Sequence, residues 1–348
     1  MSSVMTSVAD DTARRTPTAA GARPHLAAGF GLAALSAMSF GLSGALAKGL
    51  LDAGWSAGAA VTVRVSVAAL VLVVPAVRAL RGRWGLLRGN LGLLTGYGLV
   101  AVAGCQLAYF NAVVHMQVGV ALLIEYTAPV AVIGWMWLRR GERPGLLTVG
   151  GAAVAALGLV LVLDLLSGAD LSLPGVVWAL LAMVGAATYF VLSANEDNGL
   201  PPIVLAAGGL VLGAAVLAAA GVLQVVPMRM ATAPVVFRGA AVPFWLPLLA
   251  LGVVSAALAY VTGIAASRRL GSRLASFAAL LEVLFALVFA WLLLDELPRG
   301  VQLLGGVLVL AGVVLVKVGE RGVPVTSPGP DLAARIAEEP VSGRPAAG

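Results

Sequence analysis

Two segments decide the fold of this chain: EYTAPVAVIGWMWLRRGERP at residues 125–144 and LLEVLFALVFAWLLLDELP at residues 280–298. One offset, 154 residues, pairs identical residues within these segments and beyond them: Trp137 with Trp291, Glu142 with Glu296, Pro144 with Pro298, Gly151 with Gly305, and Gly158 with Gly312. Chance similarity between apolar sequences is the alternative, but tryptophan, glutamate and proline pairs at the same offset argue against it. The sequence therefore predicts two related halves.

The composition excludes a soluble protein. Hydrophobic residues make up 60% of the chain and charged residues 11%, and the mean hydropathy is +1.01. An ordinary soluble domain has about 25% charged residues, which cover its surface. The chain is therefore predicted to be an integral membrane protein of the all-α class.

A helix needs about 20 apolar residues to cross a bilayer. The sequence contains ten such runs, at residues 26–51, 57–77, 91–113, 118–138, 146–163, 174–194, 201–226, 242–266, 272–294 and 301–318. The prediction is ten transmembrane helices in two five-helix repeats, residues 26–165 and 174–318, flanked by disordered cytoplasmic tails at 1–25 and 319–348. Because each repeat has an odd number of spans, the two repeats are expected to be inverted relative to each other, as in transporters that rock around a midplane site.

The positive charges predict the orientation, because lysine and arginine are enriched in cytoplasmic loops. If the N-terminus is cytoplasmic, 17 lysines and arginines fall on that side and 3 on the other. Lys48 and Arg64 are assigned to helices. Both termini are therefore predicted to be cytoplasmic. The high content of Ala, Gly, Val and Arg indicates a GC-rich bacterial genome, so the predicted location is the inner (plasma) membrane of a bacterium.

Several function classes have no support in the sequence. The net charge of +6 lies in short loops, without the exposed aromatic side chains that a nucleic-acid groove would add. His25 and His115 are the only histidines, and the HExxH, GxxxxGK[ST] and GxSxG motifs are missing. We therefore expect no enzyme activity, no metal, no cofactor and no nucleic-acid partner, and we interpret the single cysteine, Cys105, as a small core residue.

Ionisable residues inside predicted spans are the first candidates for a functional site, because a charge at the bilayer centre is costly. They are Arg64, Glu125 and Glu282, with Lys48 near a helix end. Each glutamate could bind a proton during transport or stay paired with Arg64 or Lys48. Structural pairing, and snorkelling of the two basic side chains to the interface, are the alternatives.

Other polar residues at helical spacing could line a path for a solute. Besides the ionisable residues, the candidates are Ser39, Ser43, Gln106, Tyr109, Asn111, Tyr126 and Tyr189. Taken singly, each is better explained by a hydrogen bond between helices or by an aromatic side chain at the membrane interface. Together they predict a cavity for a small polar or zwitterionic solute.

These segments resemble the EamA-type transporters of the drug/metabolite transporter superfamily. The resemblance rests on SFGLSGALAK at 39–48, TVRVSVAAL at 62–70, LAYFNAV at 107–113 and the two segments quoted first. It implies ten spans, an inverted duplication, a central cavity and export of amino acids or other small metabolites. The chain departs from the frequent Glu-Pro pair at Glu282-Val283, where the proline-associated geometry is in doubt.

The functional prediction is a secondary transporter that exports small polar metabolites by alternating access. Its partners are a small-molecule substrate and the lipid bilayer, with protons as a candidate coupling ion. The alternatives are a receptor or accessory subunit that does not transport, and a membrane-embedded enzyme that modifies lipid. Because the family is broad in substrate, the resemblance does not identify the solute.

Overall fold

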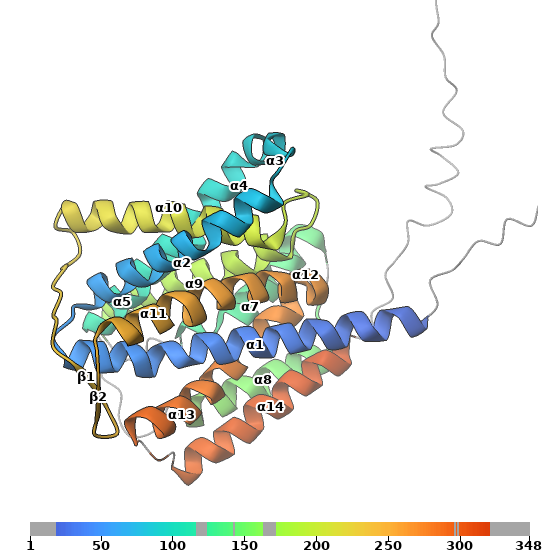
Figure 1. The fold of residues 1–348 in the computed structure, drawn as a ribbon. Helices are drawn as coiled ribbons and strands as arrows, with labels where there is room; N and C mark the ends of the chain where they lie inside the picture. The colour runs from blue at the N-terminus through green and yellow to red at the C-terminus, as the bar shows by residue number, and fades with distance from the viewer. Residues whose placement is uncertain are drawn as a thin grey trace, which may run out of the picture.

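A computed structural model of the chain describes residues 19–115, 124–141, 143–162, 172–295, 297 and 299–320. The described part is helical apart from one two-stranded hairpin (Figure 1). The first half contains α1 (Ala19–Asp52), α2 (Ala57–Ala79), α3 (Trp84–Gly89), α4 (Leu91–Gly96), η1 (Tyr97–Gly104), α5 (Cys105–His115), α7 (Ala128–Arg140) and α8 (Leu146–Val162). The second half contains α9 (Leu173–Ala194), α10 (Pro202–Val222), β1 (Val235–Phe237), β2 (Ala240–Val242), α11 (Trp245–Gly252), η3 (Val253–Leu258), α12 (Ala259–Ala278), α13 (Leu281–Leu294) and α14 (Gly300–Glu320).

Seven described helices are long and apolar enough to cross a membrane, and α8 and α13 are shorter apolar helices. Part of the predicted fourth span, residues 118–123, lies outside the described residues, as do Glu142, Glu296 and Pro298. Two predicted tails are corrected at their inner ends. Residues 19–25 belong to α1 and residues 319–320 to α14. The first helix begins before its apolar run, and the last helix ends after its own.

The predicted eighth and ninth spans also need correction. Val242 belongs to β2, and the eighth span begins as a helix at Trp245. The helical path then continues to Ala278, with a sharp kink at Gly271, whose φ of 77° suits glycine. The predicted ninth span is not one helix, because a turn at residues 279–280 separates α12 from α13.

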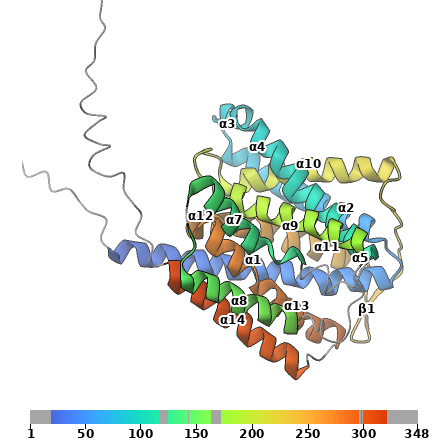
Figure 2. The same ribbon diagram turned by 180° about the vertical axis from the view of Figure 1, so that it is seen from behind.

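The helices form one bundle whose flanks differ. α8 and α14 lie side by side on one flank, α2 and α10 lie on the opposite flank, and α1 runs between them (Figures 1 and 2). The hairpin β1–β2 lies at one end of the bundle, the hairpin end, and the α9–α10 loop lies at the other end (Figure 1). The two ends of the bundle therefore carry different connections, a hairpin at one end and the α9–α10 loop at the other.

Reciprocal contacts relate the two halves on the α8–α14 flank. A Cβ atom on Gly151 would lie 2.9 Å from the Gly312 carbonyl oxygen, and one on Gly158 would lie 2.6 Å from that of Gly305. The early part of α8 therefore meets the late part of α14, so these two helices run antiparallel. The 154-residue offset pairs Gly151 with Gly305 and Gly158 with Gly312. Gly151 therefore contacts the counterpart of Gly158, and Gly158 contacts the counterpart of Gly151.

The same reciprocity holds for the π-helical segments η1 and η3. The 154-residue offset places η1 on residues 251–258, which nearly coincide with η3. Gly98 of η1 packs against Leu212 of α10, and its counterpart Gly252 packs against Val67 of α2. Each half thus bends its third helical run at the same position, where it crosses a helix of the other half.

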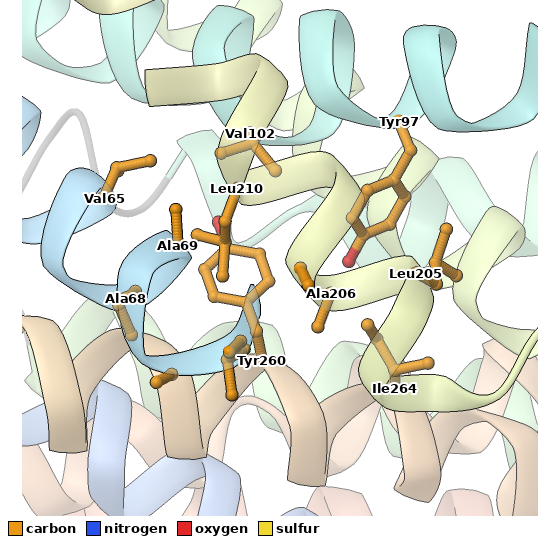
Figure 3. Packing of buried hydrophobic residues seen from close by; sticks show 14 of the residues in the cluster. Val65, Ala68, Ala69, Tyr97, Val102, Leu205, Ala206, Leu210, Tyr260 and Ile264 are labelled. Atoms are coloured by element: carbon orange, nitrogen blue, oxygen red, sulfur yellow. The ribbon is translucent and has the colours of Figure 1, made fainter. Parts of the chain in front are cut away.

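The main core lies between α2, η1, α10 and α12, where small residues let backbones approach closely. Figure 3 shows side chains from each of these elements packed together, among them Val65, Tyr97, Leu210 and Ile264. Tyr97, Leu210 and Ile264 are fully buried. In this structure the two halves pack together through these four elements.

The hairpin is held mainly by apolar packing, and we predict that its ion pair adds little stability. Arg238 lies 2.7 Å from Asp295, but the two side chains are 48% and 65% exposed, whereas Val235 is fully buried against Gly49 of α1. Arg238→Ala should lower the free energy of unfolding by no more than about 1 kcal/mol, and Val235→Ala by about 1 to 3 kcal/mol. Denaturant unfolding of both variants checks this order, and an Arg238→Ala loss larger than that of Val235→Ala would contradict it.

Candidate functional site

Helix interruptions place the two glutamates inside the bundle. Glu125 lies directly before a turn at Tyr126 and Thr127, and α7 starts at Ala128. Thr127 stabilises this turn by donating a hydrogen bond of 2.6 Å from its hydroxyl to the Ile124 carbonyl oxygen. Glu282 lies in the first turn of α13, and its N–H donates to the Ala279 carbonyl oxygen at 2.9 Å. The break before α13 forms although the proline of the family pattern is absent there.

Both glutamates line one cavity of about 920 Å³ at the centre of the bundle. Its wall comes from both halves, with residues of α1, α2, η1, α5, α7, α9, α11, α12, α13 and α14. Eight of the ten predicted site residues line it: Ser43, Arg64, Gln106, Tyr109, Glu125, Tyr126, Tyr189 and Glu282. Lys48 lines it as well.

Two predicted site residues are not brought to the cavity. Ser39 is buried, 2% exposed, on a face of α1 that does not line the cavity, and its hydroxyl has no hydrogen-bond partner among the described residues. Asn111 lies past the lining residues of α5, and its amide donates to the Leu107 carbonyl oxygen of its own helix at 2.7 Å. The helix hydrogen bond explains Asn111, whereas the position of Ser39 has no such explanation.

Arg64 is buried among the helices. Its Nη2 donates a 2.7 Å hydrogen bond to the Ser255 carbonyl oxygen, and its guanidinium carbon lies 5.9 Å from the centre of the Phe40 ring. Ser255 belongs to η3, where π-helical winding shifts the usual backbone hydrogen-bond pattern. Arg64 Nε is buried and has no hydrogen-bond partner among the described residues.

The carboxylates have neighbours of their own. Cys105 donates weakly from its thiol to Glu125 Oε1 at 3.6 Å and to the Ala182 carbonyl oxygen at 3.5 Å. Tyr126 donates a hydrogen bond to the Glu282 carboxylate. The sequence-based interpretation of Cys105 as a core residue is therefore incomplete, because its thiol faces the cavity and a carboxylate.

Aromatic rings form a further part of the cavity wall. The rings of Phe40 and Tyr260 meet edge to face at 5.3 Å, and Tyr189 meets Tyr260 at 5.7 Å. The Tyr189 hydroxyl lies against Gly263 and has no hydrogen-bond partner among the described residues. Phe40 was missed by the sequence analysis, since an apolar side chain carries no signal that distinguishes a cavity wall from a core.

The cavity extends unequally towards the two ends of the bundle. It reaches Leu51, Leu294 and Gln302, at helix termini on the hairpin end. Towards the α9–α10 end its wall stops at Ser267 and Ala275. The lining residues thus extend to helix termini at the hairpin end.

Comparison with known proteins identifies the family. The model of the EamA-like transporter family matches residues 27–164 and again residues 173–318. The chain belongs to the EamA-like transporter family. This confirms the resemblance to the drug/metabolite transporter superfamily, and the two matches confirm that the chain contains two EamA repeats.

Solved structures share the fold of this EamA protein. One, described only as "Crystal structure of protein", is 20% identical, covers 86% of this chain and 99% of its own, and superposes with a TM-score of 0.68. No curated protein sequence matches the chain. Multi-pass membrane insertion is thus established by the family and the helices, and the family is one of transporters.

Proposed function

We propose that this EamA protein is a secondary transporter that exports small polar metabolites, such as amino acids, by alternating access of the central cavity. The observation that carries the proposal is the lining of that cavity. Glu125 and Glu282 supply acceptors, and Arg64 and Tyr189 of the same wall are residues with donor groups. A zwitterion offers a group to each kind of partner, since its ammonium donates and its carboxylate accepts.

The size and walls of the cavity support a solute of this class. A volume of about 920 Å³ is within the range of small-molecule sites. Aromatic rings such as Phe40 and Tyr260 add apolar surface beside the polar groups. Buried ionisable groups inside membrane spans are costly, and a solute that pairs with them during transport gives a reason for their presence.

An inverted arrangement of ten spans is part of the proposal. The antiparallel course of α8 and α14, together with the exchange of contacts between Gly151, Gly158 and their counterparts, supports it. Such halves can rock around a site at their interface. In the proposed orientation, with both termini in the cytoplasm of a bacterium, the hairpin end faces outwards and the cavity is accessible from outside.

Glutamates in the cavity are also the proposed proton sites, if a proton gradient supplies the energy. Glu125 and Glu282 are the carboxylates among the described lining residues, and both are partly buried. Binding of a solute ammonium to the pair would compete with binding of a proton, since both neutralise the same charges. Flux against a concentration gradient would then depend on an imposed pH difference.

The test is a ligand screen followed by flux. The purified chain is screened with amino acids, nucleosides and their analogues for thermal stabilisation, and each stabilising solute is followed as a labelled compound in proteoliposomes. A solute that both stabilises and moves supports the proposal. Stabilisation without flux would favour a receptor, and chemical conversion of an added lipid would favour an enzyme; either result would overturn the proposal.

A further inference from the structure

A second pocket, separate from the central cavity, lies at the α9–α10 end of the bundle. It has a volume of about 450 Å³ and is lined by Glu196 and the loop that follows it, by the start of α10, and by Arg268 and Arg269 of α12. None of its lining residues belongs to the wall of the central cavity. The transport function proposed above makes no use of it.

Arg268 is the unusual residue of this pocket. Its Nε and Nη2 atoms are buried and have no hydrogen-bond partner within the described part of the chain. A buried guanidinium donor without an acceptor is costly. These two atoms face the protein, but Arg268 also lines the pocket, where an anion would neutralise the charge of the guanidinium.

The loop beside Arg268 is already satisfied internally. The Gly199 N–H donates to the Glu196 carbonyl oxygen at 3.0 Å, and the Leu200 N–H donates to Asn198 Oδ1 at 2.9 Å. These amides therefore shape the pocket, and Arg268 and Arg269 are its cationic side chains, although Arg269 Nη1 also donates to the Ala265 carbonyl oxygen at 3.0 Å. The buried Leu200 forms part of the wall, whereas Glu196 and Arg269 are exposed at the rim.

Glu196 makes the pocket amphoteric. A carboxylate beside two guanidiniums disfavours a ligand that carries only negative charge, but it can pair with an ammonium group of the same ligand. Arg268 and Glu196 form no ion pair within 4.0 Å in the described structure, so both remain available. We propose that this pocket binds a phosphoethanolamine group, with the phosphate on Arg268 and Arg269 and the ammonium on Glu196.

The position of the pocket indicates a lipid headgroup as the source. The Asn90 amide donates to the Asn198 carbonyl oxygen at 3.0 Å and so ties the pocket loop to α3 and α4. α3 has no buried residue, and its Trp84 is 49% exposed. Exposed tryptophans are typical of the membrane–water interface, which is where phosphatidylethanolamine presents its headgroup.

The test measures lipid binding to the full chain, purified in detergent, by native mass spectrometry. The probes are short-chain phosphatidylethanolamine, phosphatidylglycerol and phosphatidylcholine, and soluble phosphoethanolamine serves as competitor. The wild type should prefer phosphatidylethanolamine. Arg268→Gln should weaken its binding about tenfold or more, the loss expected for charge-assisted hydrogen bonds, and Arg268→Lys should weaken it less.

Glu196→Gln is the diagnostic variant, because a merely structural role would not change which lipid is bound. This variant should bind phosphatidylethanolamine only as tightly as phosphatidylglycerol, and its affinity for phosphatidylglycerol should not fall. Arg81→Gln, which removes an exposed arginine outside the pocket, is the matched control and should change nothing. Equal binding in Arg268→Gln and Arg81→Gln, or no change of preference in Glu196→Gln, would overturn the proposal.

Competition separates the possible sources of the phosphoethanolamine group. Displacement of the lipid only by a large excess of soluble phosphoethanolamine supports a lipid site. Equal affinities for the soluble compound and the lipid would overturn the assignment to a lipid headgroup. Because binding is measured without flux, this result does not depend on whether the chain transports the proposed solutes.

Discussion

Replacing Glu125 or Glu282 by glutamine is expected to lower solute flux in proteoliposomes by about 10- to 100-fold. Each substitution keeps the shape of the side chain and removes a charge from the cavity wall. A hydrogen bond to a charged group contributes about 1.5 to 3 kcal/mol, which corresponds to this range of rates if the bond is needed for solute binding. Flux at several solute concentrations measures the loss.

The matched control is Asp197→Asn, which removes an exposed carboxylate from the α9–α10 loop outside the central cavity. Its flux should equal that of the wild type. If the two glutamates bind the same solute group, the double variant should lose less than the product of the two single losses. Normal flux in both glutamine variants would make Glu125 and Glu282 structural residues.

Gly151→Ala is expected to destabilise the protein by about 1 to 3 kcal/mol, the usual cost of added atoms in a well-packed interior. The new Cβ would lie 2.8 Å from the Val316 amide nitrogen and 2.9 Å from the Gly312 carbonyl oxygen. Backbone atoms cannot move aside as a flexible side chain can, so α8 and α14 would have to separate. The free energy of unfolding in detergent measures the effect.

The neighbouring residue provides the control. Nothing lies within 4 Å of a Cβ on Gly150, so Gly150→Ala should stabilise α8 by up to about 1 kcal/mol through helix propensity alone. The two alanine substitutions, at adjacent residues, are therefore expected to change the free energy of unfolding in opposite directions. Equal stabilities of Gly150→Ala and Gly151→Ala would show that the contact between α8 and α14 is looser than described.

Much of the fold could be predicted because membrane spans are long apolar runs and because chemically distinctive residues occur at equivalent positions of the two halves. The pairs at Trp137, Gly151 and Gly158 identified two related halves, and the family match confirms two EamA repeats. The glycine pairs also marked the contact between α8 and α14. Glycine is informative here because close helix approach requires a small residue.

The breaks inside the helical runs could not be predicted in the same way. Residues 279–280 are alanine and leucine, and neither the turn before α13 nor the π-helical segments contain a proline. These features depend on crossings with other helices, such as that of Gly41 against the main chain of Glu282. A single sequence shows the residues of such a crossing but not their partner.

The residues of the candidate site could also be predicted only in part. Costly charges such as Glu125, Glu282 and Arg64 could be selected from the sequence, because a buried charge in a span needs a reason. Ser39 and Asn111 were selected on helical spacing alone, which does not distinguish a cavity wall from a packed helix face. The cation–π contact of Arg64 with Phe40 depends on tertiary packing and left no sequence signal.

The most direct test of the central claim is solute flux after the cavity has been filled. Gly44 lines the cavity and has nothing within 4 Å of its Cβ position, whereas Gly31, on the same helix, is equally open but lies outside the cavity. We expect Gly44→Trp to abolish proteoliposome flux of a solute that the wild type carries, and Gly31→Trp to leave it unchanged. Equal flux in the two folded variants would contradict a transport path through this cavity.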